Sequence, residues 1–206
     1  MSYQQLRSQM VKTQLMARDI TDPHVIMAFK KVPREKFVPS RLMNQAYHDH
    51  PLPIGEDQTI SQPYVVAKMC QLLELKGDEK VLDVGTGSGY QAAILSKLAK
   101  KVISLETIAS LALNAKKTLQ EIGCQNVEVH QQDAKFGFST EAPFDAIVSA
   151  ASSAKIPQTW KSQLAVNGRI VMPLKRGSHQ ELVRITRLEN KWKVEYFGSV
   201  AFVPLV

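Results

Sequence analysis

The stretch VLDVGTGSGYQAAIL, residues 81–95, decides the fold of this chain. A short apolar segment with the character of a strand leads to Asp83. Glycines then occupy every second position, at Gly85, Gly87 and Gly89, before a helix-forming segment begins. Glycine leaves no side chain where the backbone turns sharply and where a ligand lies against it. The stretch therefore predicts a strand, a ligand-binding turn and a helix in succession.

The spacing of these glycines distinguishes between classes of cofactor. A dinucleotide site usually has the pattern G-x-G-x-x-G, which lets the helix N-terminus bind a pyrophosphate. This chain has G-x-G-x-G, and Asp83 lies two residues ahead of the first glycine. A carboxylate there repels a pyrophosphate, but it suits the sulfonium and amino group of S-adenosyl-L-methionine. The motif favours a class I methyltransferase, and the alternative is a glycine-rich turn without a ligand.

Two further acids follow predicted strands. Residues 101–105 (KVISL) indicate the next parallel strand, and Glu106 comes directly after it. An acid about 20 residues beyond the glycine loop accepts ribose hydroxyls in such folds. The alternative is a carboxylate stabilised by the dipole of a helix that begins near Thr107. Asp133 follows a predicted strand over 127–131 and is a candidate for the adenine amino group, although a plain loop aspartate fits equally well.

Composition places the chain among soluble globular proteins. It has 206 residues, of which 44% are hydrophobic and 22% charged. Cys70 and Cys124 match no metal or redox spacing, so we expect reduced thiols and a cytoplasmic location. No signal peptide is recognisable, and no run reaches the ~18 apolar residues of a membrane span. The formal charge of +7 permits an acidic partner, but the basic residues are scattered, which argues against a nucleic-acid surface.

Periodicity and breakers predict an α/β fold. Apolar spacing indicates N-terminal helices over 3–16 and 25–31, then a proline-rich irregular segment, then a helix from 62 to 73 that Gly77 ends. Strands are predicted over 80–84, 101–105, 127–131, 144–149 and 169–174, with helices over 89–99, 108–121 and 157–164 between them. An antiparallel hairpin over 181–197 follows.

The expected architecture is a doubly wound, mostly parallel seven-stranded sheet with an N-terminal helical elaboration. We expect a single methyltransferase domain over 1–206. Within it, residues 1–76 form the N-terminal helices and a substrate lid, and residues 77–206 form the cofactor-binding core and the C-terminal strands.

The group that is methylated must be inferred outside the glycine loop. After the fourth core strand the chain reads SAAS over 149–152, where methyltransferases of exocyclic amines often have an Asn/Asp-Pro-Pro-aromatic box. Amine methylation is therefore disfavoured, and no cysteine pair is present for methylation of a base carbon. The polar segment GEDQTISQPY over 55–64 lies just before the core. Within it, Ser61 is either the N-cap of a helix that opens at Gln62 and Pro63, an active-site residue, or both.

Several segments resemble one methyltransferase family. DQTISQPYVVAKM (57–69), followed by the glycine stretch, is similar to protein-L-isoaspartate O-methyltransferases. APFDAIVSAA (142–151), NGRIVMPL (167–174) and the terminal FVPLV (202–206) match the same family, so the resemblance covers essentially the whole chain. The TISQP segment is far more specific than the glycine loop, which many methyltransferases share.

The resemblance implies an activity and a set of site residues. It implies transfer of a methyl group from S-adenosyl-L-methionine to the free α-carboxylate of L-isoaspartyl residues in damaged proteins and peptides, which initiates their repair. It makes Ser61 the active-site serine. Together with the residues of the glycine motif, the expected cofactor-binding set is Thr59, Ile60, Asp83, Gly85, Thr86, Gly87, Gly89, Glu106, Thr107, Asp133 and Ala134. We expect a monomer without a metal, nucleic-acid partner or membrane association.

The chain also departs from the family pattern. Family members commonly have Gly-Asp-Gly at 132–134, an arginine at Thr107, a proline at Ser152 and an arginine at Ala201. Two other functions therefore remain as alternatives. One is a small-molecule or RNA methyltransferase on the same scaffold, which the positive charge supports. The other is a cofactor-binding or interaction protein that has lost turnover, which the departures at Ala134 and Ala201 suggest.

Overall fold

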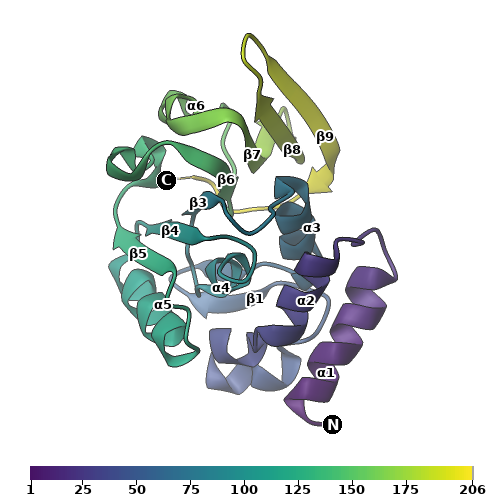
Figure 1. Cartoon of the computed structure of the whole chain (residues 1–206). Coiled ribbons are helices and arrows are strands. Elements are labelled where there is room, and N and C mark those ends of the chain that lie inside the picture. The colour runs from purple at the N-terminus through teal and green to yellow at the C-terminus, as the bar shows by residue number, and fades with distance from the viewer. Residues whose placement is uncertain (206) are drawn as a thin grey trace.

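A central sheet with helices on both faces organises the computed structural model, which describes residues 1–205 (Figure 1). Within that range the sheet has seven strands in the order β5-β4-β3-β6-β7-β8-β9. They are β3 (Lys80–Val84), β4 (Lys101–Glu106), β5 (Val127–Gln131), β6 (Phe144–Ser149), β7 (Leu164–Arg176), β8 (His179–Arg187) and β9 (Trp192–Val200). Strands β3 to β7 pair in parallel, and β8 and β9 are antiparallel. The predicted doubly wound sheet is confirmed.

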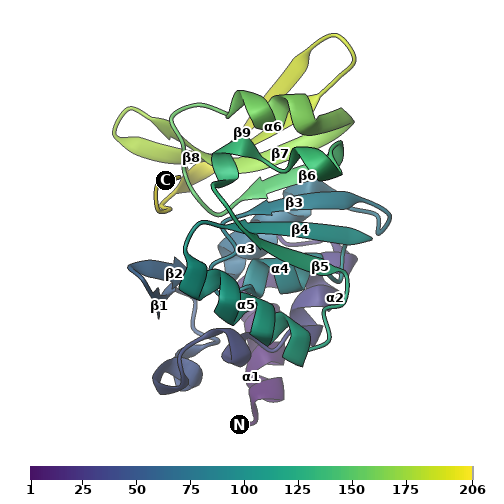
Figure 2. The same cartoon turned by 90° about the vertical axis from the view of Figure 1, so that its left-hand side faces the viewer.

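The central strands are buried on both faces because helices cover each side. Val81 and Leu82 on β3 point to opposite faces, and neither side chain is exposed. One face packs against the larger group of helices, and the short α6 (Gln158–Gln163) covers the other (Figures 1 and 2). The larger group is α1 (Tyr3–Met10), α2 (Pro23–Lys31), α3 (Pro63–Leu73), α4 (Tyr90–Leu95) and α5 (Ala109–Glu121).

The N-terminal helices belong to the same hydrophobic core as the sheet. Met10 on α1 and Leu15 on the π-helical continuation η1 (Val11–Met16) share one buried cluster with β3 and α4. The predicted start of α2 is confirmed, since the Asp22 carboxylate accepts hydrogen bonds from the backbone N–H groups of His24 and Val25. Every helix among residues 1–205 is too short or too polar to span a lipid bilayer.

The segment between α2 and α3 is more ordered than its prolines indicated. It contains the 3₁₀ turns η2 (Arg34–Phe37) and η3 (Ser40–Gln45) and an unpredicted hairpin of β1 (Leu52–Gly55) and β2 (Gln58–Ile60). The turn places Glu56 and Asp57 at φ 53° and 54°. Such turns normally have Asn-Gly or Asp-Gly, and the Glu-Asp pair gives no comparable signal. Further 3₁₀ turns follow β5, namely η4 (Ala134–Phe136) and η5 (Ser139–Glu141).

The predicted end of α3 at Leu73 is confirmed, although its C-cap is Glu74, whose φ of 51° is left-handed, and not Gly77. Two other predicted boundaries are wrong. Strand β7 begins at Leu164, so Asn167 lies inside the strand at an irregularity in its pairing with β6 and not in a preceding turn. Helix α4 is shorter than predicted and ends at Leu95. These errors arise because tertiary pairing continues or stops an element where local breakers alone indicate otherwise.

The strand order creates a crevice at the carboxyl edge of the sheet. From β3 the chain moves to β4 on one side, and β6 later pairs on the other side. Loops that leave such a switch point diverge and make a binding site. The segment after β9 returns to this edge, where Ser152 N–H donates to the Val203 carbonyl at 2.8 Å and Leu205 N–H to the Ser152 carbonyl at 2.7 Å. The β1–β2 hairpin reaches the same edge beside α5 (Figure 2).

Candidate active site

The glycine loop turns tightly at the end of β3. The backbone N–H groups of Gly85 and Thr86 donate to the Leu105 carbonyl on β4 at 2.9 and 3.1 Å. All three glycines of the motif have positive φ. At Gly89 a Cβ atom would also lie 3.3 Å from the Cβ of Ala115 on α5. The loop therefore requires glycine both for its backbone conformation and for its close packing on α5.

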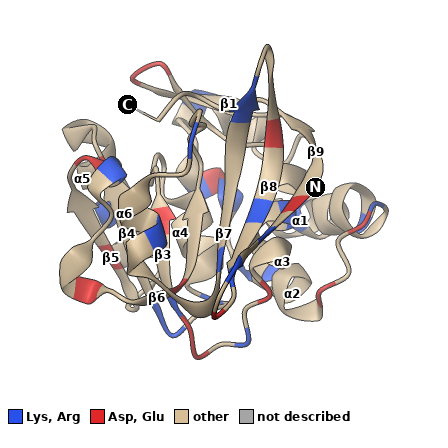
Figure 3. Ribbon diagram, turned by 90° about the horizontal axis from the view of Figure 1, so that it is seen from above, with Lys and Arg blue, Asp and Glu red and all other residues tan. Residues whose placement is uncertain are grey.

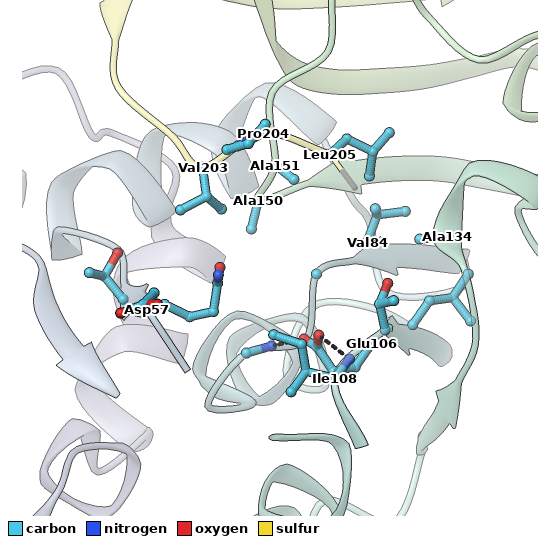
Figure 4. Close-up of a pocket in the computed structure, with 16 residues that line it drawn as sticks. Asp57, Val84, Glu106, Ile108, Ala134, Ala150, Ala151, Val203, Pro204 and Leu205 are labelled. Atoms are coloured by element: carbon cyan, nitrogen blue, oxygen red, sulfur yellow. Dashed lines mark hydrogen bonds between the residues drawn. The ribbon is translucent and has the colours of Figure 1, made fainter. Parts of the chain in front are cut away.

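Glu106 ties this loop to the segment after β4. One carboxylate oxygen accepts from the Gly87 N–H at 2.7 Å and the other from the Ile108 N–H at 3.0 Å (Figure 4). The side chain is 7% exposed and lines a cavity. An ionised carboxylate has about four lone-pair sites, so each oxygen can accept another hydrogen bond from a ligand. The position fits the predicted role toward a ribose.

The cavity beside Glu106 has a volume of ≈ 330 Å³. It is lined by residues 57–59, 84, 85, 87, 105–108, 134, 150, 151 and 203–205. Glu106 and Ile108 lie on one side of it, with Val203 and Ala150 across from them (Figure 4). Volumes of about 300–1,000 Å³ are typical of small-molecule sites. The size, the apolar walls and the carboxylate of Glu106 suit a nucleoside, and the side-chain-free glycines leave room for a ligand against the backbone.

The structure brings together six of the predicted cofactor residues at this cavity: Thr59, Gly85, Gly87, Glu106, Thr107 and Ala134. Sequence analysis missed the apolar strand ends at Val84 and Leu105, whose places follow from the strand order. The C-terminal segment 203–205 was quoted in the family resemblance, but it was not predicted to line the cofactor cavity. Asp57 and Gln58 of the hairpin fall within the predicted substrate lid, and they too were not among the predicted cofactor residues.

Five predicted residues do not line the cavity: Ile60, Asp83, Thr86, Gly89 and Asp133. Asp83 is fully buried, and its two oxygens accept hydrogen bonds from Gln91 Nε2 at 2.8 Å and Ser104 Oγ at 2.7 Å. Thr86 Oγ1 lies 2.6 Å from the same Ser104 hydroxyl. Asp133 caps η4 by accepting from the Lys135 N–H at 2.9 Å. Asp83 thus supports the loop from behind, and its part in cofactor binding stays a prediction.

Burial of Asp83 has a consequence for stability. Desolvation raises the pKa of this carboxyl from its ordinary 3.8 to about 6, against the two hydrogen bonds, which lower it. Between these two pKa values the folded state binds a proton that the unfolded state has released, so the contribution of Asp83 to stability is fully present below about pH 4 and is lost as pH rises through about 6.

Asp83→Asn should remove this dependence. Relative to the variant, we expect the wild type to lose about 2–3 kcal/mol of unfolding free energy between pH 4 and 7, at about 1.36 kcal/mol per pKa unit. Urea unfolding of both proteins across this range measures the difference. A constant gap between the two curves would contradict a raised pKa at Asp83.

A second cavity, of ≈ 660 Å³, adjoins the first. It is lined by residues 51, 59, 61, 62, 65, 150 and 199–203, and it shares Thr59, Ala150 and Val203 with the first cavity. None of these lining residues is ionisable. The C-terminal segment and the end of the β1–β2 hairpin form its walls, so residues far apart in the sequence meet there.

Ser61 lines the second cavity and does not cap α3. The N-cap of the helix is Gln62, without a side-chain hydrogen bond, so the interpretation of Ser61 as the cap is wrong. The reason is that the helix begins one residue later, at Pro63. Across residues 1–205 no hydrogen bond involves the Ser61 hydroxyl, while its carbonyl accepts from Arg34. The hydroxyl is therefore available to a ligand.

Comparison with known proteins shows the family. The family model described as "Protein-L-isoaspartate(D-aspartate) O-methyltransferase (PCMT)" matches residues 5–206. The chain belongs to this family. A protein-L-isoaspartate O-methyltransferase 1 of Syntrophobacter fumaroxidans is 50% identical over 205 residues, which are 100% of this chain and 96% of that protein. The Geobacter metallireducens protein-L-isoaspartate O-methyltransferase is 50% identical over 207 residues, with the same coverage of 100% and 96%.

Solved structures agree with the family. A putative protein-L-isoaspartate O-methyltransferase of Plasmodium falciparum, in complex with S-adenosyl-L-homocysteine, matches with a TM-score of 0.84 at 25% identity. The match covers 97% of this chain and 98% of that one. A second protein-L-isoaspartate O-methyltransferase structure has a TM-score of 0.87 at 25% identity, over 98% of this chain and 65% of that one.

As a member of the protein-L-isoaspartate O-methyltransferase family, the chain is an S-adenosyl-L-methionine-dependent enzyme. It methylates isoaspartyl residues in proteins, which initiates their repair. Of the departures from the family pattern, Thr107 and Ala134 line the first cavity and Ala201 lines the second. The family therefore favours this activity over the two alternatives, an RNA methyltransferase and a protein without turnover.

Proposed function

We propose that the first cavity holds S-adenosyl-L-methionine and that the second holds the isoaspartyl residue. The observation that carries the proposal is the wall that the cavities share, formed by Thr59, Ala150 and Val203. A donor in one cavity and an acceptor in the other meet at this wall. When bound, S-adenosyl-L-methionine supplies an electrophilic methyl group. Glu106 accepts the ribose hydroxyls, and the glycine loop lets the backbone approach the ligand.

The residues of the second cavity position a nucleophile that needs no activation. The free α-carboxylate of an isoaspartyl residue titrates near pH ~4 and is ionised at neutral pH. A general base is therefore unnecessary, in keeping with a lining that holds no ionisable side chain. Ser61 donates its free hydroxyl hydrogen bond to this carboxylate and orients it. The hairpin and the C-terminal segment exclude water, so catalysis consists mainly of alignment.

The groove should recognise the substrate backbone more than its side chains. Damaged sites occur in many sequence contexts, and the walls offer main chain and small side chains such as Ser199 and Ala201. Methyl transfer to an isoaspartyl peptide, to its aspartyl twin and to bulk RNA, followed with a tritiated methyl donor, tests the proposal. We expect base-labile label on the isoaspartyl peptide alone. Stable label on RNA, or equal label on both peptides, would contradict it.

The rate of the chemical step should depend little on pH near neutrality. The lower end of this pH range is set by Asp83, which supports the glycine loop and has a pKa of about 6. We expect single-turnover rates to vary less than about twofold between pH ~6.5 and ~8, since no essential group titrates there. A tenfold rise through this window, assigned to a protein group, would indicate an amine or hydroxyl substrate. His48 and His50, which lie outside both cavities, would then be the first groups to replace.

We further propose that the enzyme acts as a monomer in the cytoplasm, without a nucleic-acid partner. Residues of one chain line both cavities: segment 1–76, which we propose as the lid, supplies residues 57–59 to the first cavity and 51, 59, 61, 62 and 65 to the second, and the proposed core supplies the others. In the ribbon of Figure 3 the positions of lysine and arginine are interspersed with those of aspartate and glutamate, which does not favour a nucleic-acid surface. Light scattering of the purified protein tests the monomer, and a dimer whose dissociation abolishes turnover would contradict it.

A further inference from the structure

A buried arginine lies directly behind Ser61. Arg34, at the start of η2, has no exposed surface. Its Nε donates to the Ala46 carbonyl at 2.7 Å, and its Nη2 donates to the Ser61 carbonyl at 2.8 Å. The guanidinium carbon lies 4.7 Å from the centroid of the Tyr90 ring, over which it stacks. One side chain thus contacts the main chain of the second cavity and a residue next to the glycine loop.

The charge of Arg34 is not neutralised by an acid. Among residues 1–205 it forms no ion pair, and the carboxylate of the neighbouring Glu35 bonds the Tyr47 hydroxyl instead. Burial lowers the pKa of the guanidinium below its ordinary value. A buried cation held only by carbonyls and an aromatic face is costly, and apolar side chains of similar volume are often more stable in such places. The retained charge therefore indicates a role other than stability.

Tyr90 is a rigid partner for this cation. It is the first residue of α4 and directly follows Gly89 of the glycine loop. Its ring makes edge contacts with Phe29 and Phe37, at centroid separations of 6.0 and 5.5 Å, and is 1% exposed. The ring therefore has a fixed position relative to the cofactor loop. Stacking on this ring fixes the guanidinium of Arg34, which in turn donates a hydrogen bond to the Ser61 carbonyl.

We propose that Arg34 is a positioning residue, which fixes Ser61 relative to the cofactor loop so that the substrate carboxylate is aligned for transfer. The proposal rests on the role of Ser61 proposed above. The planar guanidinium reaches two carbonyls and a ring face at once, which a lysine ammonium with its flexible stem does not. Small misplacements of reacting groups cost up to about 100-fold in rate, so loss of this clamp should slow turnover without preventing binding.

The test compares Arg34→Lys, which keeps the charge, and Arg34→Met, which keeps the volume, with Arg184→Met as a control. Arg184 is a half-buried arginine on β8 that pairs with Glu74 at the end of α3 and with Glu195 on β9, and it lines neither cavity. For both Arg34 variants we expect kcat to fall at least tenfold, with peptide KM and calorimetric affinity for S-adenosylhomocysteine within about threefold of wild type. Arg184→Met should lose stability and keep its kcat. All rates are taken below the melting temperature of each variant.

A double variant separates positioning from general destabilisation. If Arg34 acts through Ser61, Ser61→Ala combined with Arg34→Lys should be no slower than Ser61→Ala alone, because residues that act as one unit are not additive. If the rate losses of the two single variants multiply in the double variant, Arg34 does not act through Ser61. A fully active Arg34→Lys together with a slow Ser61→Ala would lead to the same conclusion. Either result would overturn the proposal for Arg34 and leave the role of Ser61 in place. Full turnover in Ser61→Ala would overturn both the role of Ser61 and this proposal.

Discussion

Replacement of Ser61 by alanine should lower methyl transfer to an isoaspartyl peptide by about 10- to 1,000-fold. Removal of one oriented hydrogen bond to a reacting oxygen typically costs this much. The hydroxyl forms no hydrogen bond within residues 1–205 and lines the second cavity, so its removal leaves no protein group unpaired. Because Gln62 and not Ser61 caps α3, the free energy of unfolding should change by less than about 0.5 kcal/mol. Initial rates with saturating peptide measure the effect.

The combination of a large kinetic effect and a small stability effect makes the result informative. Ser162→Ala is the matched control, since its hydroxyl bonds only the Thr159 carbonyl on the exposed side of α6. It should keep full activity. Ser61→Thr keeps the hydroxyl and adds a methyl group in a narrow site, so it should fall between wild type and Ser61→Ala. Full activity in Ser61→Ala would remove the serine from the active site, whatever its effect on stability.

Glu106→Ala should weaken the binding of S-adenosylhomocysteine by at least about 100-fold while the protein stays folded. A carboxylate that accepts a hydrogen bond from each of the two ribose hydroxyls forms two charge-assisted hydrogen bonds, each worth about 1.5–3 kcal/mol. Even the lower bound, about 3 kcal/mol for the pair, corresponds to more than 100-fold in affinity. Titration calorimetry measures the change. Glu128→Ala is the control, because Glu128 is an acid on β5 that pairs with Lys101 and lies outside both cavities.

A ligand without ribose hydroxyls shows how Glu106 acts. Loss of Glu106 also leaves the N–H groups of Gly87 and Ile108 without their acceptor, so part of the effect could arise from the loop itself. The 2′,3′-dideoxy analogue of S-adenosylhomocysteine separates the two contributions. Wild type should bind the analogue much more weakly than the parent compound, and Glu106→Ala should bind both alike. If the variant discriminates as strongly as wild type, Glu106 does not contact the diol.

Much of the fold could be predicted because the core strands carry strong local signals. The strands over 80–84, 127–131 and 144–149 were predicted at their observed bounds. The strands over 80–84 and 144–149 are largely buried and appear as short apolar runs, whereas the edge strand over 127–131 shows apolar alternation. Glu106 could also be placed, because the end of a strand next to the glycine loop must lie at the same edge of the sheet.

The missed parts of the site depend on contacts between distant segments. The hairpin of β1 and β2 has prolines and an unusual Glu-Asp turn, so no local rule indicates it. The C-terminal segment forms walls of both cavities through hydrogen bonds between Ser152 and residues 203 and 205. No pattern within either segment reports that pairing, because the partners are about fifty residues apart and meet only when the sheet has formed.

The sequence by itself determined the glycine turn, the order of strands and helices, the family and the candidate residues. The glycine turn and the order of elements depend on conformational preferences and periodicity within a short window, whereas the family and the role of Ser61 rest on the resemblance of several segments to that family. The tertiary structure decided which candidates face a ligand. In the folded protein Glu106 lines a cavity, and Asp83 is buried behind the glycine loop. Ser61 does not cap α3, and Arg34 donates a hydrogen bond to the Ser61 carbonyl. These outcomes depend on the hydrogen-bonding partners and apolar neighbours that distant segments supply. Such partners are brought together only when the segments pack against one another.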